Sequence, residues 1–359
     1  MLLGFDGFDS YAAIEDITKN VGFMQWTNTI YSGLGVGRDG QGKALSVNAF
    51  GGPGVICSFA KSLSAGFIGM AFLTNTGDFF FNAYDTASTP NYPGMPMSRV
   101  FFLVFSHIDG SISYPGGRTG NNKFNTGSWN SLQVGWKIGA GGFLKVKIND
   151  VLVLNLLQFE NTKYVQSGYA DQTFTGVNAV SFAGSVQTQG IGVDDVYVND
   201  TLIGPGAHPC NSWLGDRRVF TLLPASNAVV AWTPGGNFGG TNWQELTTID
   251  GDETFNSTST VGAEDLFTFT PLPPNVVDIL AVQVVGCFKK ADASTRKITQ
   301  RVNSSGTEGI GQNELSPYSL ASSYTFYRDL FAVDPHTGLS WTVDALDPTL
   351  FKAGYALES

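Results

Sequence analysis

Charged residues are scarce in this sequence. Only 14% of the 359 residues are Asp, Glu, Lys or Arg, well below the roughly 25% of an average globular protein. The runs of lysine, glutamate and alanine that fill exposed helices are also scarce, whereas glycine (44) and phenylalanine (27) are abundant. This balance favours β-strands joined by tight turns over helices.

The charges that are present are mostly acidic. Thirty acidic and 20 basic residues give a formal net charge of −10, and such a surface repels a phosphate backbone unless a local basic patch offsets it. The two basic segments, at 217–218 and 289–301, lack the interleaved aromatic residues of a single-strand binder. We therefore expect no nucleic-acid partner.

Cysteine motifs and long apolar runs are missing as well. The three cysteines stand alone, which argues against a CxxC zinc site or a disulfide framework. The opening residues, MLLGFD, lack the basic start and apolar run of a secretory signal, and no apolar stretch reaches membrane-spanning length. We expect a protein that is made in a cytoplasm and does not insert into a membrane.

Short strand-like segments follow one another up to about residue 205. Segments such as KALSVNAF and GDFFFNAYD are rich in branched and aromatic residues, and many alternate apolar with polar residues. In VKINDVLVLN, Asn149 and Asp150 are predicted to form a two-residue hairpin turn. One helix is expected at 10–20, capped by Ser10. The pattern predicts two sheets packed face to face.

The first and last strands of this region are predicted to be neighbours. LGFDGFDSY begins the chain and GVDDVYVND ends the strand-rich region, and pairing the two would cover two otherwise exposed sheet edges. A segment rich in proline and glycine, 204–215, is predicted to be a linker. A second β-rich domain would follow at 216–359, with ILAVQVVGCF and RKITQRVN as adjacent strands.

Several segments carry a resemblance to known proteins. FDGFDSY, GFLKVKINDVLV and GVDDVYVND resemble the concanavalin A-like, laminin-G-type jelly roll. Together with GDRRVFTLLPASNA and STVGAEDLFTFTPLP, they resemble virion proteins of tailed bacteriophages over nearly the whole chain. The resemblance implies an all-β protein with a concanavalin A-like jelly-roll sandwich at 1–203 and a smaller C-terminal β-sandwich assembly domain at 216–359.

Motifs of catalysis are missing. No ExDxxE strand of the glycanases occurs, and the nearest acidic cluster, QELTTIDGDETF, reads as a solvated turn in the second domain. HxxxH and GxSxG are absent too. A GxGxxG match in GLGVGRDGQG is followed by a strand rather than by the helix that a dinucleotide site needs. We therefore predict a protein that is not an enzyme and has no organic cofactor.

The strongest metal candidates are four aspartates at the two paired strands. Asp6 and Asp9 lie in the first strand region, and Asp194 and Asp195 lie in the last. Adjacent residues of a regular strand point to opposite faces, so Asp194 and Asp195 are not expected to act as a pair. One member of each pair could meet near a sheet edge and hold a calcium ion, which prefers several oxygen ligands. Turn capping and solubility are the competing interpretations.

Two tryptophans in polar turns are candidate platforms for a sugar ring. Trp129 lies in TGSWNSLQ and Trp243 in GGTNWQEL. The competing interpretation is that each ring packs on its own domain.

The resemblance implies a structural component of a phage particle, made in the host bacterial cytoplasm and located in the virion. The main hypothesis is a tail-associated fibre, adaptor or receptor-binding protein. It would assemble with other virion proteins and with its own copies, as a trimer or hexamer, and would bind a host-surface glycan. The alternatives are a capsid decoration protein without glycan binding and a glycan-degrading enzyme.

Overall fold

The structure, a computed structural model, divides the chain into two compact units. It describes residues 2–27, 32–40, 42–47, 54–86, 98–157, 174–185, 191–200, 213–236, 239–311 and 316–359. The first unit comprises residues 1–9, 13–18 and 23–219, and the second comprises 10–12, 19–22 and 220–359. Of the linker predicted at 204–215, only residues 213–215 belong to the described part of the chain.

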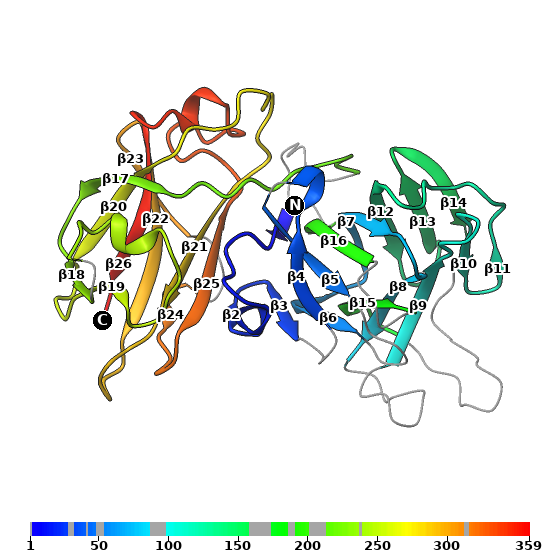
Figure 1. Cartoon of the computed structure of the whole chain (residues 1–359), viewed down its shortest axis with the longest axis horizontal. Helices are drawn as coiled ribbons and strands as arrows, with labels where there is room; N and C mark the ends of the chain where they lie inside the picture. Colours follow the sequence, from blue (N-terminus) through cyan, green and yellow to red (C-terminus); the bar gives the residue numbers. More distant parts are fainter. Residues whose placement is uncertain are drawn as a thin grey trace. The chain divides into compact units, whose positions relative to one another are not determined.

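Two antiparallel sheets make up the first unit (Figure 1). The first sheet has the order β14-β13-β12-β7-β16-β5-β4, with β1 also on β16. Its strands are β1 (Leu2–Asp6), β4 (Ser32–Val36), β5 (Lys43–Val47), β7 (Ala65–Thr74), β12 (Trp129–Lys137), β13 (Phe143–Ile148), β14 (Val151–Leu157) and β16 (Ile191–Asp200).

The second sheet has the order β11-β10-β9-β8-β15-β6-β3. Its strands are β3 (Met24–Thr27), β6 (Val55–Leu63), β8 (Phe79–Asp85), β9 (Ser98–Phe105), β10 (Ile112–Tyr114), β11 (Gly117–Arg118) and β15 (Val177–Gly184).

Aromatic side chains fill the space between the two sheets. Phe72 of the first sheet contacts Phe79 and Phe105 of the second, with ring centroids 5.6 and 5.1 Å apart. Phe101 and Trp136 meet across the same layer at 6.3 Å. All five are fully buried, as expected where every second side chain of a strand points into a sandwich. The predicted fold, a concanavalin A-like jelly roll, is confirmed.

Two local predictions are confirmed in the first unit. Strand β1 pairs with β16, with Phe5 opposite Tyr197. The hairpin of β13 and β14 turns at Asn149 and Asp150, which have φ values of 48° and 64°. Positive φ at both central residues is what a type I′ turn requires, and asparagine and aspartate tolerate it better than most residues.

The helix predicted at 10–20 is wrong. That region forms only a 3-10 helix, η1 (Ile14–Thr18), followed by the short strand β2 (Asn20–Val21). The reason lies in the division of the chain, because residues 10–12 and 19–22 belong to the second unit while 13–18 belong to the first. A second 3-10 turn, η2 (Arg38–Gly40), joins β4 to β5.

In the described residues, no helix has both the length and the apolar character to cross a membrane.

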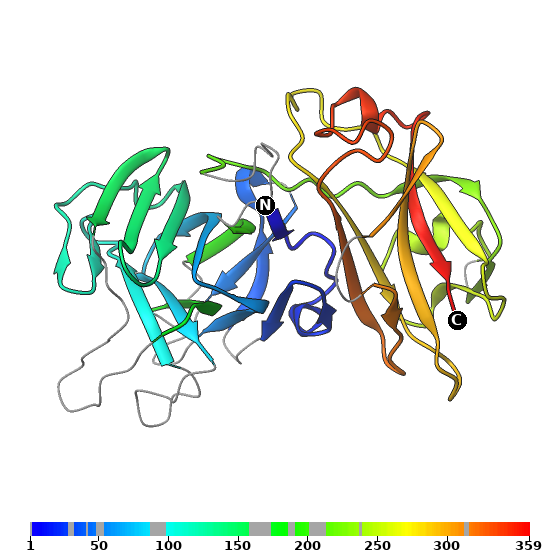
Figure 2. The same ribbon diagram turned by 180° about the vertical axis from the view of Figure 1, so that it is seen from behind.

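The second unit is the smaller β-sandwich (Figure 2). One sheet has the order β17-β20-β26-β22-β23 with β24 also on β22, another has β2-β25-β21, and β18 pairs with β19. The elements are β17 (Pro224–Val229), β18 (Thr233–Gly236), η3 (Gln244–Leu246), β19 (Thr254–Ser257), β20 (Glu264–Phe269), β21 (Val282–Phe288), β22 (Lys297–Ser304), β23 (Thr307–Ile310), β24 (Tyr318–Ser319), β25 (Thr325–Phe331), η4 (Asp344–Leu346) and β26 (Phe351–Leu357).

The prediction that β21 and β22 pair is wrong. Strand β21 pairs with β25, whereas β22 lies between β26 and β23 in the other sheet. The polar connector between them therefore crosses from one layer to the other instead of closing a hairpin. Buried side chains such as Tyr327 and Tyr355 fill the space between these layers.

Candidate functional site

A β-bulge brings the two adjacent aspartates of β16 to one place. The pairing of β16 with β7 shifts register between Asp194 and Tyr197, and Asp195 has a φ of 52°. The strict alternation of a regular strand is therefore broken, and both carboxylates contact Arg38: its backbone N–H donates to Asp194 (2.9 Å), and its guanidinium lies 3.8 Å from Asp195. The prediction that they point to opposite faces is wrong, because it assumed a regular strand.

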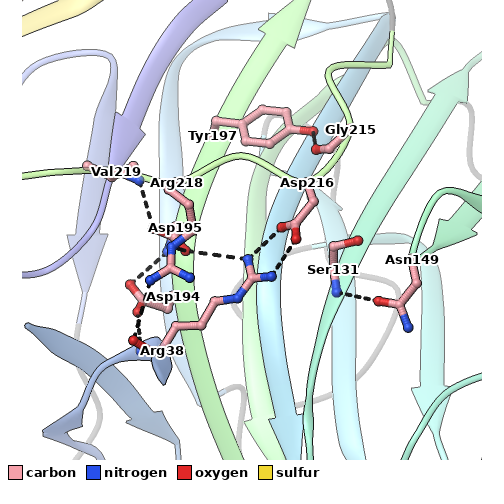
Figure 3. A network of polar contacts seen from close by, with 10 residues as sticks. All are labelled: Arg38, Ser131, Asn149, Asp194, Asp195, Tyr197, Gly215, Asp216, Arg218 and Val219. Carbon is pink, nitrogen blue, oxygen red and sulfur yellow. Dashed lines mark hydrogen bonds and ion pairs between the residues drawn. The ribbon is translucent and has the colours of Figure 1, made fainter. Parts of the chain in front are cut away.

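The two aspartates lie in a network with the segment after the predicted linker (Figure 3). Asp195 accepts a hydrogen bond from the Val219 N–H at 2.8 Å and faces the Arg218 guanidinium at 3.3 Å. Arg38 also forms a bidentate pair with Asp216. We call residues 213–219 the strap.

The strap lies on the outer face of the first sheet. The Gly215 N–H donates to Gln133 of β12 at 2.8 Å, and Tyr197 Oη lies 3.2 Å from the Gly215 carbonyl oxygen. The ring of Trp213 packs edge-on against Phe67 of β7, with centroids 4.7 Å apart. Together with the hydrogen bonds and ion pairs of Figure 3, these contacts hold the strap to the jelly roll.

Burial sets the protonation of both aspartates. It raises the pKa of Asp194 to about 7, and the neighbouring Asp195 adds to the rise. Burial also raises the pKa of Asp195 to about 6, against the opposing effects of the Val219 N–H and of Arg218 and Arg38. Removing a carboxylate from water disfavours its charged form, and nearby cations offset only part of that cost.

The four aspartates predicted to bind calcium are held by groups of the protein itself. Asp6 accepts hydrogen bonds from the Phe8 N–H and the Trp26 indole, both at 2.9 Å, and Asp9 accepts one from the Lys43 N–H at 2.6 Å. The described residues contain no group of three or more His, Cys, Asp or Glu side chains that could hold a metal ion.

The positive charge beside Asp194 and Asp195 comes from Arg38 and Arg218, which fit an ion-pair network better than a calcium site. Calcium binding stays a prediction.

The two candidate tryptophans lie in different surroundings. Trp129 begins β12, and its half-buried ring lies against Gly192 of β16, on the outer face of the first sheet. Trp243 is half-buried at the start of η3 and packs against the core cluster of the second unit. Packing within its own domain thus buries much of the Trp243 ring. The structure places Trp129 and Trp243 in different units.

The outer face of the second sheet carries polar and aromatic side chains that the sequence did not single out. The side chains at its centre are buried: Tyr84 is 2% exposed and packs with Ile56 and Ala179, and Ser181 and Asn82 are buried beside it. Because Phe79 and Phe81 point to the core, the alternate residues of β8 point outward. Strand register then aligns two outward rows across β3, β6, β15, β8 and β9. The first row is Gln25, Ser58, Ala179, Tyr84 and Arg99, and the second is Thr27, Ile56, Ser181, Asn82 and Phe102.

Hydrogen bonds connect the centre of these rows. Ser181 Oγ lies 3.2 Å from both Tyr84 Oη and the Asn82 amide nitrogen. The guanidinium carbon of Arg99 lies 4.8 Å from the centre of the Phe102 ring, which is a cation–π distance. Burial raises the pKa of Tyr84 against the lowering effects of Ser181 and Arg99. The arrangement combines an aromatic ring, a cation and neutral hydrogen-bonding groups on one face.

A signal for this face was present in the sequence. In DFFFNAYD, the core positions Phe79, Phe81 and Ala83 alternate with Phe80, Asn82 and Tyr84. The second set faces away from the space between the sheets, and Tyr84 packs there in a small buried cluster with Ile56 and Ala179. The candidate residues from the sequence were carboxylates and tryptophans, so these positions were not among them.

The similarity of the chain to known proteins lies among solved structures. No family model matches the chain, and no curated relative matches it. Among solved structures, the Caenorhabditis elegans galectin LEC-6 has 14% identity and a TM-score of 0.27, covering 43% of this chain and 94% of the galectin. The alginate lyase Aly36B, in a mutant form with an alginate trisaccharide, has 15% identity and a TM-score of 0.35, covering 55% and 97%. An endo-β-1,4-glucuronan lyase from the fungus Trichoderma reesei has 14% and 0.32, covering 49% and 90%.

The prediction that the chain is not an enzyme is corrected by these comparisons. Two of the similar folds are lyases, so missing glycosidase carboxylates do not exclude catalysis on this fold. The motifs sought were those of glycosidases, metalloproteases, serine hydrolases and dinucleotide-binding enzymes, and none of these is a lyase motif.

Proposed function

We propose that the jelly roll binds a glycan on the outer face of its second sheet. The observation that carries the proposal is the half-buried Phe102 ring, which lies beside the half-buried Arg99 on this face. Phe80 and Phe102 are half-buried on this face, and the C–H face of a sugar ring packs on such aromatic rings. On the same face, the exposed Gln25 and Thr27 of β3 offer an amide and a hydroxyl that can pair with sugar hydroxyls, which suits the mixture of apolar and polar groups in small-molecule sites.

The outer face of the first sheet is less suitable for a glycan. The strap already occupies part of that face through Gly215 and Trp213. Trp129, also on that face, is the alternative platform that the sequence predicted.

Binding to an immobilised panel of bacterial polysaccharides tests the proposal, followed by titration calorimetry on the polymer retained. Phe102→Ala should weaken binding at least tenfold, because it removes the stacking ring while leaving the core untouched. Trp129→Ala, a matched loss of a half-buried ring on the other sheet, should leave binding unchanged. A folded protein that retains no polymer, or a Trp129→Ala variant that alone loses binding, would reject the proposed face.

The setting we propose is a phage particle, from the sequence resemblance described above. The chain would be a tail-associated homo-oligomer that presents its jelly roll to a host-surface glycan, and a capsid decoration protein is the alternative. Antibody labelling of purified virions separates tail from head, and light scattering of the purified chain measures the number of copies. Virions that do not contain the chain would contradict the phage setting but would leave the glycan-site proposal intact.

A further inference from the structure

We infer that the edge strand β14 is a docking site for an extended, acidic segment of a partner protein, which joins the first sheet as an additional strand. This inference goes beyond the proposed function and does not depend on the glycan face. In the described part of the chain, β14 pairs only with β13 and so ends its sheet. The outward backbone groups of such a strand are a template for another extended chain.

Strand β14 lacks the charged residues and prolines that usually keep an edge strand from pairing with another chain. Its sequence, VLVLNLL, contains neither. Its apolar side chains are open to solvent, since Val151 is 63% exposed, Leu152 46% and Leu157 67%. Its pairing with β13 is regular from Leu154 to Leu157, so this part of the strand is extended and can accept a further strand.

The outward side chains next to this edge are basic. Leu144 and Val146 of β13 are fully buried in the core, so Lys145 and Lys147 point outward. Lys137, exposed at the end of β12, points to the same side. Strands β13 and β14 contain no Asp or Glu, although the chain has a formal charge of −10. A basic face in so acidic a protein is suited to a negatively charged partner.

The two lysines of β13 lie over aromatic rings rather than beside carboxylates. The Lys145 ammonium group is 5.0 Å from the centre of the Phe143 ring, and the Lys147 ammonium group is 5.0 Å from the centre of the Trp213 ring. Among the described residues, neither lysine has an ion-pair partner. A ring face does not neutralise a charge, so both ammonium groups remain available to a carboxylate.

The spacing of the strands suits carboxylates on an added strand. Such a strand would lie about 10 Å from β13, which is twice the usual distance of about 4.8 Å between neighbouring strands. A lysine and a glutamate side chain together span this distance, and the residue that lies between them, opposite Lys145, is the short and exposed Asn155. Alternate residues of an extended segment point to one face, so two glutamates in a Glu-x-Glu pattern match Lys145 and Lys147.

Charge and backbone chemistry distinguish an acidic protein segment from other partners. A second copy of this chain, paired through its own β14, would bring Lys145 and Lys147 again to the same face and no carboxylate from its β13 or β14. A polyuronate would satisfy the lysines, but it has no regular row of amide groups to pair with a strand edge.

The test uses seven-residue peptides, the length of β14, in which a varied Val, Ile or Thr alternates with Glu. The matched peptides have Gln in place of every Glu. Fluorescence anisotropy with the full-length protein should show at least tenfold tighter binding of the Glu peptides, with an affinity that falls as salt rises. The double variant Lys145→Gln/Lys147→Gln should remove this preference. Lys290→Gln/Lys352→Gln, the same change of charge in the second unit, should alter binding less than twofold.

A second pair of variants tests the edge itself. Leu157→Glu places a like charge on β14 and should weaken binding of the Glu peptides at least tenfold. Val36→Glu makes the same change on β4, the other edge of the same sheet, where Val36 is 71% exposed, and should have less than a twofold effect. Hydrogen exchange should slow at the amides of β14 when a Glu peptide is bound and stay unchanged at those of β4.

Four outcomes would overturn the inference. Equal binding of Glu and Gln peptides, unaffected by the lysine variants, would remove the acidic partner, and no binding of either set would remove the docking edge. Sedimentation of the chain as a dimer that Leu157→Glu dissociates would identify a second copy as the occupant. Binding of a polyuronate that requires Lys145 and Lys147, without protection of β14 by the peptides, would identify a polysaccharide. The Phe102→Ala test of the glycan face is decided separately from all four.

Discussion

Arg328 donates a hydrogen bond of 2.6 Å to the hydroxyl of Tyr11, although the two residues lie 317 positions apart in the sequence. The guanidinium also lies over the Tyr11 ring at 5.2 Å and donates to Asn20 at 3.0 Å. Next to this cluster, β2 runs parallel to β25, with Asn20 opposite Phe326. Residues from the start of the chain thus complete the second unit, and a buried cation is satisfied by them.

Tyr11→Phe should destabilise the second unit. The change removes the hydroxyl that accepts from both Arg328 and Asn20, and the loss of one acceptor of a buried charged group costs about 1–3 kcal/mol. Urea unfolding of the full chain measures the loss. Tyr324→Phe is the matched control, since its hydroxyl bonds to the exposed Asp252 and should cost less than about 1 kcal/mol. Equal costs for the two variants would contradict the role given to Tyr11.

A fragment of residues 220–359 should be markedly less stable than the same residues in the full chain. It lacks β2, which leaves one side of β25 uncovered, and an uncovered strand edge is prone to aggregation. A synthetic peptide of residues 9–23 added in excess should raise the melting temperature of the fragment and reduce its aggregation. The same peptide with Tyr11→Ala should do so less. A fragment that melts like the full chain would show that the N-terminal residues are dispensable.

The stability of the first unit should fall as pH rises through neutrality. The pKa of Asp194 is raised to about 7 and that of Asp195 to about 6 in the folded chain, while the unfolded values lie near 3.9. The folded state therefore binds these protons more tightly, and the stability they contribute is complete below about pH 4 and lost by about pH 7–8. Linkage puts the loss at a few kcal/mol.

The variant Asp194→Asn tests this dependence of stability on pH. The free energy of unfolding of the variant, minus that of the wild type, should increase between pH 5 and 8, because the amide does not ionise. Chemical denaturation at each pH gives the difference. Glu15→Gln alters an exposed carboxylate and should give a flat difference. A flat line for Asp194→Asn would mean that its proton is not coupled to folding.

Gly69→Ala should loosen the strap. A Cβ at position 69 would lie 2.0 Å from the Tyr197 ring, and Tyr197 contacts both Gln133 and Gly215. Overpacking of this kind costs about 1–3 kcal/mol, and displacement of Tyr197 should expose the strap to trypsin at Arg217 and Arg218. Gly33→Ala adds a Cβ with nothing within 4 Å and should leave the cleavage rate unchanged. Equal cleavage rates in the two variants would show that Tyr197 does not hold the strap in place.

Much of the fold could be predicted because its signals are local. Alternation in segments such as GDFFFNAYD marks strands, and Asn149-Asp150 marks a hairpin turn. The pairing of β1 with β16 followed from the need to cover two edges. The prediction of a helix at 10–20 was wrong because Asn20 pairs with Phe326 of β25. No local sequence pattern indicates a partner so distant.

The candidate site was harder to predict because bulges control it. Asp194 and Asp195 were assigned to opposite faces by counting along a regular strand, yet a register shift brings both to Arg38. Arg99 joins Phe102 on one face by a second shift. A single extra residue reverses every later side chain of a strand, and the sequence alone does not show where it falls.

The chain passes between its two units after residues 9, 12, 18, 22 and 219. Neither unit is therefore a contiguous stretch of the gene. A recombination event at position 219 would transfer the second unit without β2 and Tyr11, and the recipient would have to supply its own substitute for them. The two units should accordingly be inherited as a pair rather than exchanged as separate domains.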